Sequence, residues 1–209
     1  MEFEEIQKIL KDTEYDAGVR LHLGCGRNYM PGWVNVDIGD VKKDFYFDLE
    51  KCPEKPSVFG DNTFTHMYCA HTLEHIKNIL PLMEELYRIA KDGCVFIITV
   101  PHGSNDAAFE DPTHVRHFFE KSFLYFGQSM YGGADYGYKG DWENTDLFYT
   151  LKQSTLKEFS SYEQCQAAIH SWRNVVEDFH AVLIARKPAR TNLKRFDTPA
   201  ISILSIKDE

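Results

Sequence analysis

The stretch that most constrains the fold is residues 19–37, which read VRLHLGCGRNYMPGWVNVD. Residues 19–23 alternate apolar and polar side chains in a β-favouring run, as in a buried strand. The glycines of residues 24–26 then let the backbone turn tightly and come close to a ligand. A second apolar strand, residues 33–36, ends in the carboxylate of Asp37. This layout is typical of a nucleoside-binding crevice at the carboxyl ends of parallel strands, where a carboxylate can accept hydrogen bonds from both ribose hydroxyls.

The spacing of this stretch argues against NAD as the nucleotide. A dinucleotide fingerprint has glycines at G-x-G-x-x-G and an acidic residue about 20 residues further on, after a full helix. Here Tyr29 stands at the position of the third glycine, and Asp37 comes too early for such a helix. The NAD hypothesis is therefore disfavoured.

The sequences LHLGCG and VNVDI resemble the first two motifs of the class I S-adenosylmethionine-dependent methyltransferases. The variant PGWVNVD resembles a compact branch of bacterial and phage-type members, and the similarity extends more loosely to about Pro188. The resemblance implies S-adenosylmethionine as cofactor and an α/β fold, with a doubly wound, mostly parallel Rossmann-like sheet and a closing antiparallel strand. In this family an acidic residue after the third strand commonly faces the adenine. The resemblance places the following residues at the cofactor: Gly24, Cys25, Gly26, Asp37, Ile38, Asp48, Leu49 and His71.

Two features depart from the common family pattern. The glycine motif often runs G-x-G-x-G, whereas this chain has Asn28 at the third position. Asn tolerates left-handed backbone angles better than most residues, so the turn can be kept. In addition, only residues 25–32 separate the two strands, although a parallel crossover normally needs a dozen or more residues, usually as a helix. We therefore expect a shortened first crossover, either a loop or a single helical turn closed by Pro31-Gly32.

Composition restricts the class of protein and its location. The 209 residues suit one domain, expected over 1–188 with an N-terminal helix, and a tail over 189–209. No apolar run is long enough to cross a membrane, and the N-terminus lacks the apolar region of a signal peptide. The five scattered cysteines are typical of reduced thiols, which favours a cytoplasmic protein. The net charge of −9, without a basic stretch outside the short tail, disfavours nucleic acid as a partner.

Hydrophobic periodicity predicts the remaining elements. Strands are expected over residues 44–49, 64–70, 94–100, 146–151 and 175–186, and helices over 2–11, 78–90, 120–130 and 162–171. Asp92-Gly93 should stop the helix over 78–90. Alternation of strands and helices favours a doubly wound sheet. Two outcomes are open for the apolar residues 201–206, namely disorder or an edge strand added to a partner subunit in a homodimer.

The sequence HTLEH over residues 71–75 has two interpretations. H-x-x-E-H is an inverted zinc-protease signature, and on a helix His71 and His75 would lie on one face as two zinc ligands. No third ligand is evident from the sequence. In its strand–turn–helix context the segment instead resembles the fourth methyltransferase motif, with His71 at the mouth of the strand. We therefore expect no metal at His71 and His75, and a zinc hydrolase remains the rival enzyme.

The loop over residues 101–119 follows the fifth strand, so it should emerge at the same edge as the glycine turn. Methyl transfer to a hydroxyl or amine requires removal of a proton, and imidazole exchanges protons near neutral pH. The catalytic candidates are His114 as leading general base, His117 and Arg116 to orient the acceptor, and His102 as second choice for the base. Two alternatives are that the histidines only satisfy loop backbone, or that His114 and His117 bind a metal with Asp111.

The expected function is methyl transfer from S-adenosylmethionine to a small-molecule or sugar-like acceptor. Enzymes that methylate amino groups of DNA or glutamine resemble an Asn/Asp-Pro-Pro-aromatic pattern after the fourth strand, whereas residues 69–72 here read CAHT. The glycine- and tyrosine-rich residues 131–142 form either a mobile lid or a plain loop. A rival of another class is a non-catalytic module that senses S-adenosylmethionine or its product.

Overall fold

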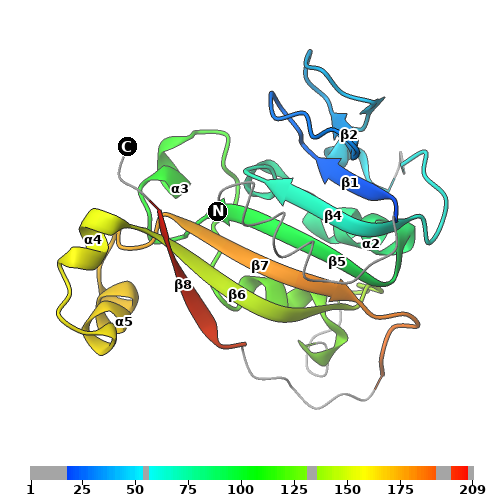
Figure 1. Ribbon diagram of the computed structural model, residues 1–209. Coiled ribbons are helices and arrows are strands. Elements are labelled where there is room, and N and C mark those ends of the chain that lie inside the picture. The colour runs from blue at the N-terminus through cyan, green and yellow to red at the C-terminus, as the bar shows by residue number, and fades with distance from the viewer. Residues whose placement is uncertain (1–17, 54–56, 131–135, 192–198, 207–209) are drawn as a thin grey trace.

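One eight-stranded sheet organises the computed structural model, which describes residues 18–53, 57–130, 136–191 and 199–206 (Figure 1). The strand order is β3-β2-β1-β4-β5-β7-β6-β8. The strands are β1 Arg20–Leu23, β2 Val34–Asp37, β3 Phe45–Tyr46, β4 Phe64–Ala70, β5 Ala90–Pro101, β6 Trp142–Lys152, β7 Asp178–Ala185 and β8 Ile201–Ile206. Strands β1 to β5 are parallel, β7 is antiparallel to β5 and β6, and β8 is parallel to β6. The mostly parallel sheet with a closing antiparallel strand confirms the fold predicted from the sequence.

The described helices are mostly short. They are α2 Ile79–Ile89, α3 Ala107–Glu110, α4 Gln153–Lys157 and α5 Tyr162–Ser171, with 3₁₀ helices η1 Leu49–Lys51, η2 Leu73–His75, η3 Ser122–Phe126 and η4 Gln128–Met130. Helix α2 packs behind β4 and β5 (Figure 1), with Leu82, Met83 and Leu86 fully buried. No helix in the described ranges is both long and apolar enough to span a membrane.

Several predicted boundaries were wrong, for local reasons. The third strand is only two residues long, because the side chain of Asp48 accepts a hydrogen bond from the Glu50 amide and starts η1. Helix α2 ends before Asp92-Gly93, because Ala90 already pairs with Phe64 in the sheet. The sixth strand begins at Trp142, earlier than predicted, and α4 was not predicted at all.

The helix predicted over residues 120–130 is replaced by η3 and η4. In a 3₁₀ helix residues three apart lie on one side, so Phe123 and Phe126 are buried together. The ring of Phe123 also stacks on Phe118, with centroids 5.0 Å apart. Aromatic packing therefore overrides the local helical pattern. The helix expected over residues 2–11 and part of the 131–142 segment lie outside the described residues.

The short crossover between β1 and β2 is a loop, as expected, and Asn35 at 0% exposure holds it in place. Its side-chain amide donates to the carbonyls of Met30 (2.9 Å) and Trp33 (2.8 Å), and its Oδ1 accepts from the Met30 amide at 2.9 Å. The Asp44 carboxylate accepts from the backbone amide of Asn35 at 2.8 Å. These bonds satisfy backbone groups that a crossover helix would have satisfied internally.

The loop also covers the sheet face opposite α2. Met30 and Trp33 pack against Tyr68, Val95, Ile97 and Val182 in a second, smaller apolar cluster. Successive side chains of a strand point to opposite faces, so these strand residues face away from the core under α2. In the shortened crossover, two large apolar side chains therefore cover the part of the sheet that a crossover helix would otherwise cover.

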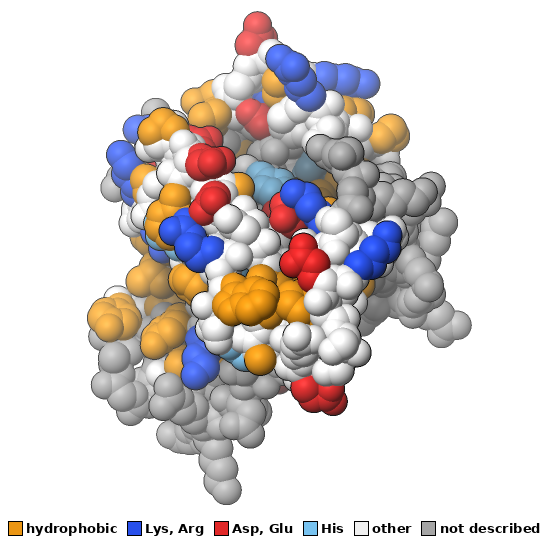
Figure 2. Space-filling model, turned by 90° about the vertical axis from the view of Figure 1, so that its left-hand side faces the viewer, with side chains coloured by type: hydrophobic (Ala, Val, Ile, Leu, Met, Phe, Trp, Pro, Cys, Tyr) orange, Lys and Arg blue, Asp and Glu red, His pale blue; other side chains and the backbone are white. Residues whose placement is uncertain are grey.

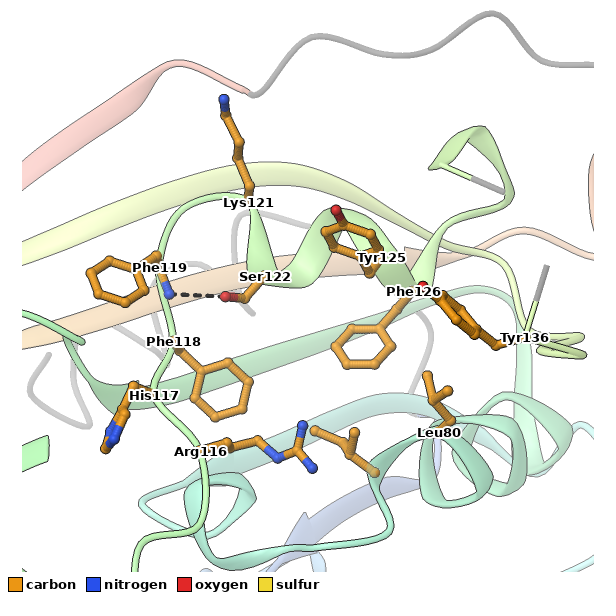
Figure 3. A pocket seen from close by; sticks show the side chains of 11 residues that line it. Leu80, Arg116, His117, Phe118, Phe119, Lys121, Ser122, Tyr125, Phe126 and Tyr136 are labelled. Atoms are coloured by element: carbon orange, nitrogen blue, oxygen red, sulfur yellow. Dashed lines mark hydrogen bonds between the residues drawn. The ribbon is translucent and has the colours of Figure 1, made fainter. Parts of the chain in front are cut away.

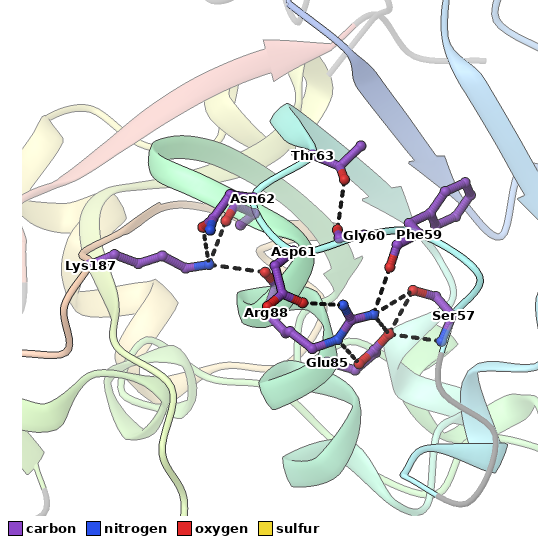
Figure 4. Close-up of polar contacts among 10 residues, drawn as sticks. Ser57, Phe59, Gly60, Asp61, Asn62, Thr63, Glu85, Arg88 and Lys187 are labelled. Atoms are coloured by element: carbon purple, nitrogen blue, oxygen red, sulfur yellow. Dashed lines mark hydrogen bonds and ion pairs between the residues drawn. The ribbon is translucent and has the colours of Figure 1, made fainter.

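Arg88 of α2 connects this helix to the loop that precedes β4 through hydrogen bonds and ion pairs (Figure 4). Its guanidinium donates to Glu85 at 2.7 Å, to Asp61 at 2.5 Å and to the carbonyl of Phe59 at 2.8 Å. The Glu85 carboxylate also accepts from the amide and hydroxyl of Ser57.

At the other end of the chain, β8 lies beside β6 of the same chain, whereas an edge strand on a partner subunit was one of the outcomes considered.

Candidate functional site

A cavity of about 330 Å³ opens at the edge where β1, β2 and β4 end. Figure 2 looks at this edge of the molecule and shows histidine side chains in a hollow bordered by acidic ones. The cavity is lined by Gly24, Gly26, Asp37, Ile38, Phe47, Asp48, Leu49, Glu50, His71, Thr72, His75 and Ile76. The structure thus gathers seven of the eight residues that the sequence assigned to a cofactor. The eighth, Cys25, is buried behind the turn, with its Sγ 3.7 Å from the carbonyl oxygen of Lys42.

The two glycines present bare backbone to the cavity. Gly24 and Gly26 have φ values of 58° and 50°, in the left-handed region that favours glycine. A Cβ atom on Gly24 would lie 2.2 Å from Oγ1 of Thr72, whereas one on Gly26 would meet nothing within 4 Å. Gly24 therefore has no room for a side chain, and Gly26 faces open space that a ligand can fill.

The carboxylate of Asp37 is fixed by backbone donors. Its Oδ2 accepts from the Gly26 amide at 2.8 Å, and its Oδ1 accepts from the Gly39 amide at 2.6 Å. A carboxylate offers about four lone-pair sites, so each oxygen can still accept from a ligand hydroxyl. The geometry suits recognition of a vicinal diol.

Apolar side chains also contribute to the lining of the cavity. Ile38 is 61% exposed at one wall, while Leu49 is buried and Phe47 lies beside it in the lining. Asp48 uses Oδ1 to cap η1, with the Glu50 amide 3.1 Å away. Five lining residues were not assigned to the site from the sequence, although all lie within or next to the motifs that were examined: Phe47, Glu50, Thr72, His75 and Ile76.

His71 is a histidine on the cavity wall, and its side chain is 52% exposed. Its φ of 48° turns the chain sharply at the end of β4. Nδ1 lies 3.6 Å from the Glu74 carboxylate and Nε2 lies 3.8 Å from that of Asp178. Glu74 and then Asp178 raise the pKa of His71 above its ordinary value, although burial opposes them. Burial likewise raises the pKa of Asp178, which is the first residue of β7.

None of the four predicted catalytic residues is among the residues that line this cavity. His114 hydrogen-bonds through Nδ1 to the Ala108 carbonyl at 3.1 Å, and its ring meets the His75 ring edge-on, with centroids 4.7 Å apart. His102 is buried against Tyr149, and its Nδ1 hydrogen-bonds to Ser104 Oγ at 2.8 Å. Both therefore make contacts with the loop or the core.

Arg116 and His117 line a different, largely aromatic cavity of about 430 Å³ (Figure 3). Arg116 extends toward the start of α2 and donates to the carbonyls of Ile76 and Lys77, both at 3.0 Å. The ring of His117 stacks on Phe109, with centroids 4.0 Å apart. These contacts occupy the two side chains that were expected to orient an acceptor.

Comparison with known proteins identifies the type of domain. Residues 21–98 match the model of a methyltransferase domain family. This range contains all the residues that line the 330 Å³ cavity, among them the glycine turn, Asp37 and His71. No curated protein matches the chain significantly.

Solved structures with the same fold cover most of the chain. An S-adenosylmethionine-dependent methyltransferase from Archaeoglobus fulgidus is 15% identical with a TM-score of 0.59, over 88% of this chain and 94% of that one. A putative methyltransferase from Haloferax volcanii, in complex with the Trm112 methyltransferase activator, is 14% identical with a TM-score of 0.53, over 87% and 88%. Phosphoethanolamine N-methyltransferase 2 of Haemonchus contortus, in complex with S-adenosylmethionine, is 15% identical with a TM-score of 0.50, over 88% and 53%.

Proposed function

Because this chain carries a class I S-adenosylmethionine-dependent methyltransferase domain, we propose that it methylates a small-molecule acceptor that enters the 330 Å³ cavity beside His71. The reaction class and the cofactor follow from the family model and the fold. The choice of acceptor and of the proton-accepting side chain is our proposal. The observation that carries it is that one cavity combines the Asp37 carboxylate, the bare glycine turn and a half-exposed imidazole.

The residues present fit the parts of S-adenosylmethionine. Asp37 would accept hydrogen bonds from both ribose hydroxyls, and the turn of Gly24 and Gly26 leaves room for the ligand. Ile38 and Leu49 offer apolar surface to the adenine, and Asp48 offers a carboxylate oxygen to its amino group. When bound, S-adenosylmethionine supplies an electrophilic methyl group on a positively charged sulfur, and the transfer leaves the neutral thioether S-adenosylhomocysteine.

The acceptor must lose a proton as it attacks the methyl carbon. We assign this proton to His71 rather than to His114, because His71 lines the cavity and is half exposed. Glu74 and Asp178 flank its ring and hold it at the end of β4. The net charge of −9 further supports a small acceptor over nucleic acid.

Calorimetry tests the cofactor site. The wild type should bind S-adenosylmethionine and S-adenosylhomocysteine but not NAD. Loss of a charged hydrogen-bond acceptor costs about 1.5–3 kcal/mol, so Asp37→Asn should weaken binding roughly tens-fold to a hundred-fold. Asn keeps the shape of Asp37 and can still accept from one of the two backbone amides, those of Gly26 and Gly39, that Asp37 binds. Asp40→Asn, at an exposed position outside the cavity, is the matched control and should bind like wild type.

Turnover with labelled S-adenosylmethionine tests the acceptor. S-adenosylhomocysteine should form when the dialysable fraction of a cell extract is added, and the label should appear in a small molecule. A positioned base contributes about 10²–10⁴-fold, so His71→Asn should lower turnover by that range with little change in cofactor affinity. Label found only in macromolecules would contradict a small-molecule acceptor. Tight binding with no transfer to any fraction would instead indicate a sensor.

A further inference from the structure

We propose that Glu74, His75 and His114 bind one divalent first-row transition-metal ion beside the cofactor cavity. One ligand atom from each residue lies within 4.8 Å of those from the other two. His71, the other histidine of the HTLEH segment, does not belong to this group. The third ligand that the sequence did not reveal thus comes from the loop after β5.

The backbone holds the two ligand segments together. The Val115 amide donates to the Glu74 carbonyl at 2.8 Å, which places His114 directly beside η2. Arg116 adds its two hydrogen bonds to the carbonyls that follow His75. The ligand geometry is therefore fixed by main-chain and guanidinium contacts that do not use the ligand atoms.

The hydrogen bonds also decide which ring nitrogens are available. Nδ1 of His114 contacts the Ala108 carbonyl, which only accepts, so this nitrogen carries the proton. Oγ1 of Thr113 lies 2.6 Å from the Asp111 carboxylate and therefore donates its only proton there. The same oxygen lies 2.9 Å from Nδ1 of His75 and must accept from it. Each ring therefore directs Nδ1–H at an acceptor, so in its neutral form the lone pair lies on Nε2, as in metal-binding histidines held by a second-shell partner. Nε2 of His114 also lies 3.9 Å from an oxygen of the Asp111 carboxylate.

The buried carboxylate of Glu74 is a second, independent observation that indicates a bound cation. Its side chain is 2% exposed, and neither oxygen has a hydrogen-bond partner within the described residues. A buried carboxylate without hydrogen bonds is strongly unfavourable unless a positive charge compensates it. His71 lies at 3.6 Å on one side, and a metal ion held by the two imidazoles would satisfy the carboxylate from the other.

Two imidazoles and one carboxylate are a donor set suited to Zn²⁺, Fe²⁺, Co²⁺ or Mn²⁺, and three protein ligands leave coordination positions open. Because His75 lines the cavity, an open position would face the acceptor. Such an ion acts as a Lewis acid and makes a hydroxyl group more acidic. The acceptor would then be a hydroxylated compound. This last step rests on the proposed function, whereas metal binding itself does not.

Titration of metal-stripped, tag-free protein with Zn²⁺, Co²⁺ and Mn²⁺ tests the site. We expect one ion per chain in wild type. Removal of a ligand in Glu74→Gln or His114→Ala should weaken binding by at least about 100-fold, and Thr113→Val, which removes only the outer hydroxyl, by about 10–100-fold. His117→Ala removes a nearby loop imidazole that is stacked on Phe109, and it should bind metal like wild type.

Calorimetry with S-adenosylhomocysteine, run on the same samples, separates the possible failures. Normal S-adenosylhomocysteine binding shows that each variant is folded. Wild type that binds S-adenosylhomocysteine but none of the three ions would overturn the metal site and leave the methyltransferase proposal standing. Metal binding that is lost equally in His117→Ala, or kept in Glu74→Gln, would also overturn it. Metal binding without any S-adenosylhomocysteine binding would instead contradict the proposed function.

Discussion

The two glycines of the β1–β2 turn differ in what a methyl group would meet, and this separates their effects. Gly24→Ala adds a left-handed backbone penalty of about 1–2 kcal/mol and a clash with Thr72 that costs about 1–3 kcal/mol more. We expect Gly24→Ala to lose about 2–5 kcal/mol of unfolding free energy in urea denaturation. Gly26→Ala should lose only the backbone part, about 1–2 kcal/mol, because its Cβ meets nothing.

The same pair of variants reports on the cavity. The added methyl of Gly26→Ala projects into the space left for the ligand, so S-adenosylhomocysteine affinity should fall although the fold is kept. In the Gly24→Ala background, Thr72→Ala removes the clashing side chain and should restore part of the lost stability. Equal destabilisation by Gly24→Ala and Gly26→Ala would show that a clash with Thr72 does not contribute to the loss of stability.

At the scale of an element, the crossover loop depends on one side chain. Asn35→Leu leaves the Met30 amide and the carbonyls of Met30 and Trp33 without their buried partners. Each of these three orphaned groups costs about 1–3 kcal/mol, so the variant should lose about 3–9 kcal/mol of unfolding free energy. Asn28→Ala in the same loop, at an exposed position, should change it by less than about 0.5 kcal/mol. A loss below about 1 kcal/mol in Asn35→Leu would mean that the loop is held by packing alone.

Helix α2 is attached by a charged network rather than by packing alone (Figure 4). Burial raises the pKa of Glu85, but the hydrogen bonds from Arg88 and Ser57 outweigh it and hold the pKa below its ordinary value. Arg88→Met removes the partner of a buried carboxylate and should cost about 3–5 kcal/mol. The double variant Arg88→Met/Glu85→Met should be more stable than Arg88→Met, since no unpaired charge remains. Thermal denaturation of the three proteins checks this order.

For the whole molecule, Glu120 ties the loop after β5 to the sheet and should make stability depend on pH. His102, whose Nε2 lies 3.9 Å from Oε1 of Glu120, and then the hydroxyl of Tyr149, which donates to it, lower the pKa of Glu120 from 4.5 to about 2 despite burial. The folded protein therefore binds fewer protons than the unfolded chain between these values, so stability is full above pH 4.5 and lost as the pH falls toward 2. We expect a loss of about 2–3 kcal/mol over this range. Glu120→Gln should remove that part of the pH dependence, whereas Glu110→Gln at an exposed position should keep it.

Sequence reasoning succeeded where the determinants are local. The strand predicted over residues 64–70 and the helix predicted over 162–171 match β4 and α5 with their observed bounds. Seven of the eight residues that the motifs assigned to a cofactor line one cavity, although their role in cofactor binding stays a prediction. Sequence reasoning was less informative for the loop histidines, because their surroundings are set by distant contacts. The Ala108 carbonyl binds one nitrogen of His114, and the bond from Val115 to Glu74 places its ring against His75. These contacts cannot be predicted from the spacing of residues in the sequence.

The position of β7 has a consequence for how the chain is made. β7 lies between β5 and β6 although it follows both in sequence. While the ribosome extends the chain from the end of β5 to residues 178–185, the outer edge of β5 has no partner strand. At roughly 5–20 residues per second, this interval lasts on the order of 5–15 s. During this interval the apolar part of β5, residues 94–101, which is buried in the folded protein, offers unpaired backbone to other nascent chains. Ribosome-bound fragments that stop before residue 178 should therefore be the species that chaperones capture.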